Sequence, residues 1–118
     1  MKYDVPMRSI YIPKITPSLN EVLRRHWSIN YAEKRSWIGW ITVLVGVPAC
    51  QYRRIIITRV ATRDLDPDNL AGGCKSLLDA IRDVGLILDD DAKSVSVEYR
   101  QRRPRDGEET GTELEFFA

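Results

Sequence analysis

Two short stretches of the chain are rich in aspartate. Asp64, Asp66 and Asp68 alternate with other residues, and residues 89–91 are three consecutive aspartates that follow a predicted helix. Alternate side chains of an extended segment share one face, so the first three carboxylates can converge, and they repel one another without a cation. Mg²⁺ prefers oxygen ligands and often takes phosphate as a further ligand. The first stretch therefore predicts a magnesium site, and a strand-loop-helix-loop path can return the second stretch to the same sheet edge.

The first acidic stretch has three competing explanations. It resembles the start of an EF-hand loop, but Asn69 stands where that loop requires Gly and Lys75 where it requires Glu. An aspartyl-phosphate phosphatase would need a much longer chain. Capping of a helix explains Asp68 by itself, since Asp is a good N-cap and is common beside proline. Capping does not require six aspartates in two stretches, which favours a metal site.

Opposite charges are segregated along the chain. Residues 1–63 hold eleven Lys/Arg and three Asp/Glu, whereas residues 64–91 hold two Lys/Arg and eight Asp, although the whole chain carries a net charge of only +1. This pattern suits a polyanion bound around a cation, but charges that only coat a soluble surface explain it as well. His26 is equally a phosphate contact or a surface residue. The candidate nucleic-acid contacts, each of which by itself is better explained as a solvated surface charge, are Arg24, Arg25, Lys34, Arg35, Arg63, Arg102, Arg103 and Arg105.

Hydrophobic periodicity predicts the elements that position these residues. A first helix starts near Asn30, with Asn30 and Glu33 as a capping box, and a second helix runs over residues 70–84 to Gly85. Residues 15–20 form a loop. Strands are predicted at 8–13, 53–61, 94–101 and 113–117. The chain is therefore one α/β (α+β) domain, residues 1–118, with a small mixed sheet, two helices packed on it and the order β-α-β-α-β-β.

Several classes of protein are excluded by composition. No apolar run approaches the roughly 20 residues that span a bilayer, and the N-terminus lacks the features of a signal peptide, so we expect a cytoplasmic protein. Cys50 and Cys74 have no partners for a zinc site and are expected to be reduced. The three tryptophans, Trp27, Trp37 and Trp40, are assigned to the core or to a dimer interface.

The motifs around the acidic stretches resemble the RusA family of Holliday junction resolvases. The resemblance spans about residues 10–95, and the combination of motifs is specific although each piece by itself is weak. Its signature is D-x-D-N-L, a Lys, D-A-L and G-x-x-x-D-D, preceded by a P-P-S-x-N stretch. The matching residues are Pro17-Ser18-Leu19-Asn20, Asp66-Pro67-Asp68-Asn69-Leu70, Lys75, Leu78-Asp79-Ala80-Ile81, Gly85 and Leu88-Asp89-Asp90.

This resemblance implies a homodimer that binds four-way DNA junctions and makes paired nicks with Mg²⁺ or Mn²⁺. It implies that Asp66, Asp68 and Asp90 hold the metal and that Lys75 is the catalytic lysine. Asn69 lies beside the second carboxylate and is a further candidate contact to DNA. Whether Asp64, Asp89 or Asp91 joins the site stays open, and Asp79 either caps or pairs with Arg82 instead of binding metal.

One departure from the family pattern concerns Lys75. The best-known pattern has Lys three residues after Asn, whereas Lys75 follows Asn69 by six because Ala71, Gly72, Gly73 and Cys74 intervene. Glycine is poor inside helices, which favours a helix that begins later and has Lys75 in its first turn, near the metal. Two rival functions are a non-catalytic protein that binds branched or duplex DNA, and a nuclease that acts on other branches.

Overall fold

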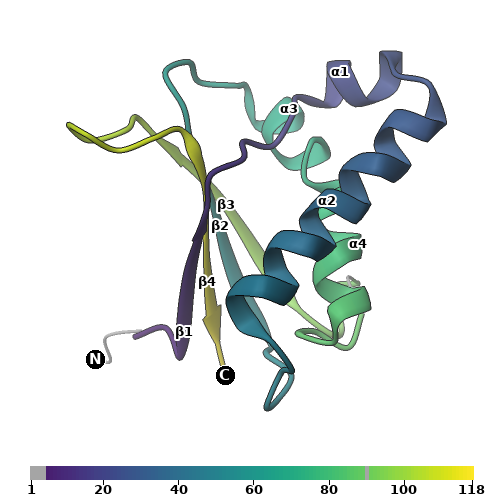
Figure 1. Cartoon of the computed structure of the whole chain (residues 1–118), viewed down its shortest axis with the longest axis vertical. Coiled ribbons are helices and arrows are strands. Elements are labelled where there is room, and N and C mark those ends of the chain that lie inside the picture. Colours follow the sequence, from purple (N-terminus) through teal and green to yellow (C-terminus); the bar gives the residue numbers. More distant parts are fainter. Residues whose placement is uncertain (1–4, 90) are drawn as a thin grey trace.

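One mixed sheet organises the chain, and the computed structural model describes residues 5–89 and 91–118. The strand order is β1-β4-β2-β3, with β2 and β3 parallel and the other neighbours antiparallel. The helices all lie on one side of this sheet (Figure 1). The strands are β1 (Arg8–Ile12), β2 (Arg54–Val60), β3 (Ser96–Arg102) and β4 (Gly111–Phe117). The predicted α+β class, mixed sheet and element order are therefore confirmed.

Each predicted helical connection contains two helices instead of one. The first holds α1 (Leu19–Arg24) and α2 (Trp27–Val45), and the second holds α3 (Pro67–Gly72) and α4 (Lys75–Val84). The first division was missed because Pro17 and Asn20 indicate a loop, whereas Ser18 caps α1. The second follows from Gly73 and Cys74, which form a turn between α3 and α4.

The predicted start of the long helix at Asn30 is wrong. His26 is the N-cap of α2, and its Nδ1 accepts a hydrogen bond from the backbone of Ser28 at 3.2 Å. The capping box lies instead in α1, between Ser18 and Glu21, since Ser is the stronger form of that motif. Glu33 is buried, so it is not available to cap a helix start.

The core lies between the helices and the sheet. Ile55 and Ile57 of β2 face the helices, as do residues of β4, because alternate residues of a strand share one face. Trp37 is fully buried, which agrees with its predicted place in the core. Trp27 is mostly exposed and Trp40 is 37% exposed, so neither belongs to the core. Within residues 5–89 and 91–118, no helix combines the length and apolar character needed to cross a bilayer.

The parallel pairing of β2 with β3 decides where the acidic stretches lie. Arg54 pairs with Ser96 and Val60 pairs with Arg102, so the two strands start at one edge of the sheet and end at the other. Residues 61–66 leave β2 at the edge where it ends, but residues 91–95 enter β3 at the opposite edge. The predicted return to the same edge is therefore wrong, because a parallel crossover carries the chain back along the strand.

Candidate functional site

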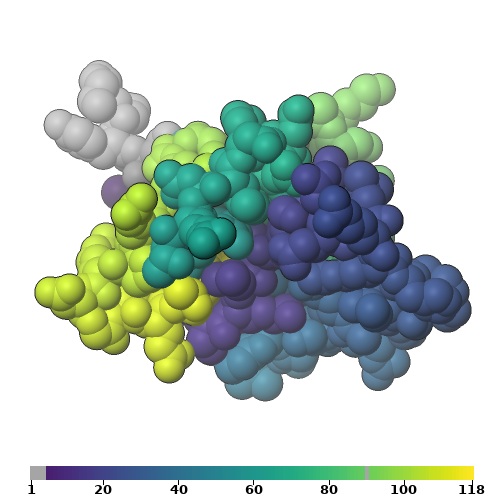
Figure 2. Space-filling model, turned by 90° about the horizontal axis from the view of Figure 1, so that it is seen from above, coloured from purple at the N-terminus to yellow at the C-terminus, as the bar shows by residue number. Residues whose placement is uncertain are grey.

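The acidic loop, residues 61–66, leaves the carboxyl end of β2. Its backbone is held by the side chain of Gln101 on β3, which accepts from the Leu65 N–H at 2.9 Å and donates to the Leu65 carbonyl at 2.7 Å. Figure 2 looks onto this end of the molecule, where the teal surface of the loop lies between the yellow β3–β4 turn and the purple N-terminal segment. The loop is thus anchored at Leu65, while Asp64 beside it is exposed.

Asp66 is the N-cap of α3, directly before Pro67 at the first helical position. Its Oδ1 accepts from the backbone N–H of Asn69 at 2.9 Å, and its Oδ2 accepts from Asn69 Nδ2 at 2.8 Å. These two hydrogen bonds stabilise the ionised form and hold the pKa of Asp66 below its ordinary value. The carboxylate is exposed, and each of its oxygens keeps a lone pair for a further partner.

Asn69 joins the two parts of the chain that carry the motifs. Besides its bonds to Asp66, its Oδ1 accepts from the backbone N–H of Asn20 at 3.0 Å. The turn after α3 packs against the same N-terminal segment, because a Cβ on Gly73 would lie 1.7 Å from the Pro17 carbonyl oxygen. Only glycine fits at Gly73. Gly72 and Gly73 therefore allow a close contact with the N-terminal segment that the sequence pattern did not predict.

Oxygen ligands for a metal are present at this end of the sheet, although the described residues do not form a complete site. Asp68 is exposed in the first turn of α3, two residues after Asp66, and Asp64 is exposed in the loop. Among residues 5–89 and 91–118, no three His, Cys, Asp or Glu side chains gather closely enough to hold a metal. Asp90, the predicted third carboxylate, lies outside the described residues. Asp64, Asp66 and Asp68 still suit Mg²⁺, which takes few carboxylates and keeps several waters.

Lys75 is the first residue of α4, as the later helix start predicts, although Gly72 belongs to α3 and only Gly73 lies in the turn. Its Nζ donates to Asp79 Oδ1 at 3.0 Å, and the same oxygen lies 3.6 Å from Arg82 Nη1. Asp89 Oδ1 lies 4.0 Å from Arg82 Nη1. Alternating charges therefore follow one side of α4 from Lys75 to Asp89, and Asp79 pairs with Arg82, one of its two predicted roles.

Asp91 belongs to a turn before β3. Its Oδ1 accepts from the backbone N–H groups of Lys93 at 3.0 Å and Ser94 at 2.9 Å. This is the usual way in which an aspartate stabilises a turn. Capping thus explains Asp91, which sequence patterns alone could not separate from its neighbours.

Three of the candidate DNA contacts are neutralised within the protein. Arg25 Nη1 lies 2.9 Å from the buried carboxylate of Glu33, and Lys34 Nζ lies 2.7 Å from Asp83 Oδ2. Arg102 forms a bidentate ion pair with Glu108. The remaining candidates are exposed, and they are Arg24, Arg35, Arg63, Arg103 and Arg105.

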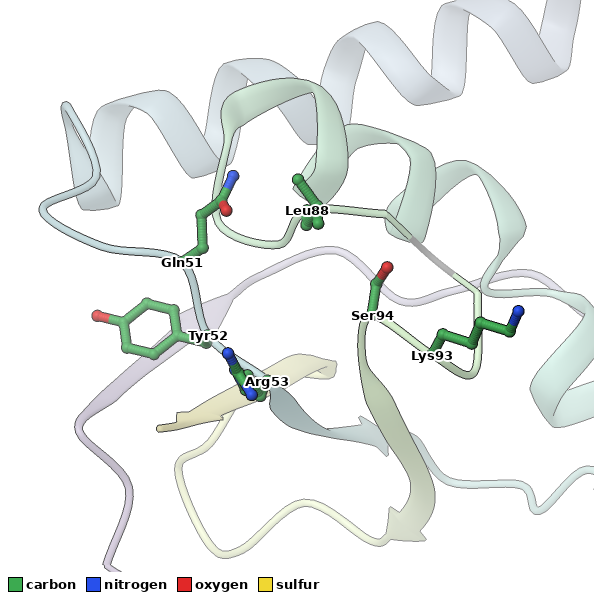
Figure 3. A pocket seen from close by; sticks show the side chains of 6 residues that line it. All are labelled: Gln51, Tyr52, Arg53, Leu88, Lys93 and Ser94. Carbon is green, nitrogen blue, oxygen red and sulfur yellow. The ribbon is translucent and has the colours of Figure 1, made fainter.

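A polar pocket of about 300 Å³ lies at the opposite edge of the sheet (Figure 3). It is formed where β2 and β3 begin, since the Ser96 N–H donates to the Arg53 carbonyl there. Seven residues of β2 at about 3.3 Å each separate it from the acidic loop by roughly 20 Å. It is therefore distinct from the acidic loop. It is lined by Gln51, Tyr52, Arg53, Leu88, Lys93 and Ser94.

Comparison with known proteins does not place the chain in a family. No protein-family model matches it, and no curated protein matches its sequence. The assignment of a function therefore depends on the residues and contacts described above.

Proposed function

We propose that this chain is a Mg²⁺- or Mn²⁺-dependent endodeoxyribonuclease of the RusA type, which resolves four-way DNA junctions by paired nicking in recombination and repair. The observation that carries the proposal is the contact of Asn69 with both Asp66 and Asn20. The two segments that resemble the family lie far apart in sequence, and this contact joins them into one unit. A capping role for Asp66 does not require the bond to Asn20.

Asp66 and Asp68 would hold the metal in this proposal, with waters completing its coordination. When bound, Mg²⁺ lowers the pKa of a coordinated water and neutralises charge on the phosphate. The amide of Asn69 orients the Asp66 carboxylate, so that its free lone pairs keep a fixed direction. Lys75 carries an exposed ammonium at the start of α4, which in this proposal leaves Asp79 to stabilise negative charge on a bound phosphate.

A homodimer suits a four-way junction, which is roughly two-fold symmetric and needs two sites to nick opposite strands. The exposed surface of α2 supports such an interface. Val43 is 80% exposed and lies beside Trp40 and Leu44, which are also exposed. Apolar groups that cluster on a surface in this way commonly mark an interface between proteins. The two free cysteines suit the reducing cytoplasm, where we expect the protein to act.

The decisive experiment incubates the purified chain with a synthetic four-way junction or a linear duplex, in Mg²⁺ or Mn²⁺. We expect symmetrical paired nicks in the junction alone. Asp68→Asn should abolish them, because it removes an exposed carboxylate with little effect on the fold. Asp106→Asn is the matched control, since Asp106 is an exposed aspartate in the β3–β4 turn. Equal cleavage of the linear duplex would show a nuclease of another specificity.

The second candidate function is DNA binding without cleavage. It is favoured by the absence of three converging metal ligands among the described residues. It predicts a complex with the junction that forms equally well in EDTA and in Mg²⁺, and no nicks with either metal. That result would reject the enzyme and leave the DNA-binding function.

A further inference from the structure

A buried arginine lies directly beneath the acidic loop. Arg59 is only 7% exposed, on the face of β2 that also carries Ile55 and Ile57. Within the part of the chain that the structure describes, no carboxylate lies within ion-pair distance of its guanidinium. A charged group is costly to bury unless its hydrogen bonds are satisfied, so the partners of this side chain need an explanation.

The guanidinium of Arg59 binds two carbonyl groups from different segments. Its Nε donates to the Thr16 carbonyl at 3.0 Å, and its Nη1 donates to the Arg63 carbonyl at 3.0 Å. Thr16 is the first residue of the segment 16–20, which also contains Asn20. Arg63 lies in the acidic loop. The planar guanidinium carries its donors in a rigid fork, so the two carbonyls are held at a defined separation.

Each segment also has a contact of its own with the sheet. The Thr112 hydroxyl donates to the Lys14 carbonyl at 2.7 Å, and the side chain of Gln101 holds Leu65. Loss of Arg59 would therefore leave both segments attached to the sheet and in contact through Asn69, but less rigidly placed relative to each other. Asn69 bonds to Asn20 of one segment and to Asp66 at the end of the other, so a shift between the segments would change the position of the Asp66 carboxylate.

We propose that Arg59 is a positioning residue, which fixes the acidic loop relative to the segment 16–20 and so orients Asp66 and Asp68 without touching DNA. The inference rests on the proposed nuclease function, because it concerns the same site. Misplacement of reacting groups by about 1 Å can cost roughly 100-fold in rate, which sets the expected size of the effect.

The kinetic test compares Arg59→Met, which removes both hydrogen bonds, with Arg59→Lys, which keeps the charge but loses the fork. Ile57→Ala is the control, since it destabilises the next helix-facing position of the same strand. At temperatures where circular dichroism shows all variants folded, we expect Arg59→Met to lower kcat on the junction about 100-fold with KM within about 3-fold. Arg59→Lys should recover part of kcat, and Ile57→Ala should keep it.

Two kinetic outcomes would overturn the inference. They are an unchanged kcat in Arg59→Met, or an equal loss in Ile57→Ala, which would show that lowered stability alone explains the effect.

Hydrogen exchange separates failure of this inference from failure of the proposed function. In Arg59→Met we expect faster amide exchange in peptides covering residues 13–20 and 61–69, and unchanged exchange in α2. An inactive wild-type chain would reject the nuclease, yet the exchange data would still decide whether Arg59 holds the two segments. Unchanged exchange in both peptides would overturn the positioning role.

Discussion

Two segments leave the sheet at the same edge but differ in whether their carboxylates are paired with cations. The β3–β4 turn, residues 103–110, follows the end of β3, and the acidic loop follows the end of the parallel strand β2. In the turn, Glu108 accepts from Arg102 at 2.7 and 2.9 Å and from the Arg105 backbone at 2.9 Å. These bonds lower the pKa of Glu108 to about 2.

Among residues 5–89 and 91–118, no cation forms such a pair with the carboxylates of the acidic loop or of the first turn of α3. Asp66 is held by an amide, which has no charge, and Asp64 and Asp68 are exposed. Paired charges close a turn and leave little capacity for a ligand, whereas carboxylates held by neutral donors keep their negative field. We therefore propose that the turn serves stability and that the acidic loop serves binding.

Asp66→Asn should lower nicking of the four-way junction at least 100-fold, whereas Asp106→Asn in the turn should leave it unchanged. Asn is as good an N-cap as Asp, so the variant should fold while losing a charged metal ligand. Rates are measured at saturating Mg²⁺ with equal concentrations of folded protein. Equal losses in both variants would remove the distinction between the two segments.

Mg²⁺ should stabilise the protein through the acidic loop. A ligand at ten times its Kd adds about 1.4 kcal/mol, which corresponds to a rise in Tm of roughly 4–6 °C for a domain of this size. Differential scanning calorimetry with and without Mg²⁺ measures the rise. Asp68→Asn should abolish it and Glu108→Gln should not. The same rise in Asp68→Asn would place the ion elsewhere.

Asn69→Ala should weaken the link between the acidic loop and the segment 16–20. The lost bond to Asn20 is expected to cost about 0.5–1.5 kcal/mol in urea unfolding at pH 7. The lowered pKa of Asp66 stabilises the fold above the unfolded value of 3.8, and this contribution disappears as pH falls through the folded pKa. The variant should therefore lose less stability than the wild type on acidification. Parallel acid titrations of the two proteins would contradict this.

Glu108→Gln should have the smallest effect at neutral pH and a clear effect in acid. Because the folded pKa is about 2 and the ordinary value is 4.5, the Arg102–Glu108 pair stabilises the fold above pH 4.5. That stability is lost as pH falls from 4.5 towards 2. A plot of Tm between pH 6 and pH 2 should be flatter for the variant. An identical slope would show that the pair contributes nothing measurable.

Much of the architecture could be predicted because it follows from local patterns. β-branched residues and alternation located the strands, and the stripe of Leu77, Leu78 and Ile81 located α4. The errors lie where one residue type has two roles. Pro17 and Asn20 indicate a loop, yet Ser18 starts a helix between them, and Gly73 serves close packing against Pro17 instead of flexibility.

The α+β class, the strands and the concentration of carboxylates after β2 could be predicted because they depend on composition and short-range periodicity. Which charges are neutralised and which remain available depends on the packing of the folded chain. The bonds of Asn69 to Asn20 and of Arg59 to Thr16 join residues more than forty positions apart. No local pattern encodes such contacts, since they exist only after the sheet and helices have packed and brought the segments together.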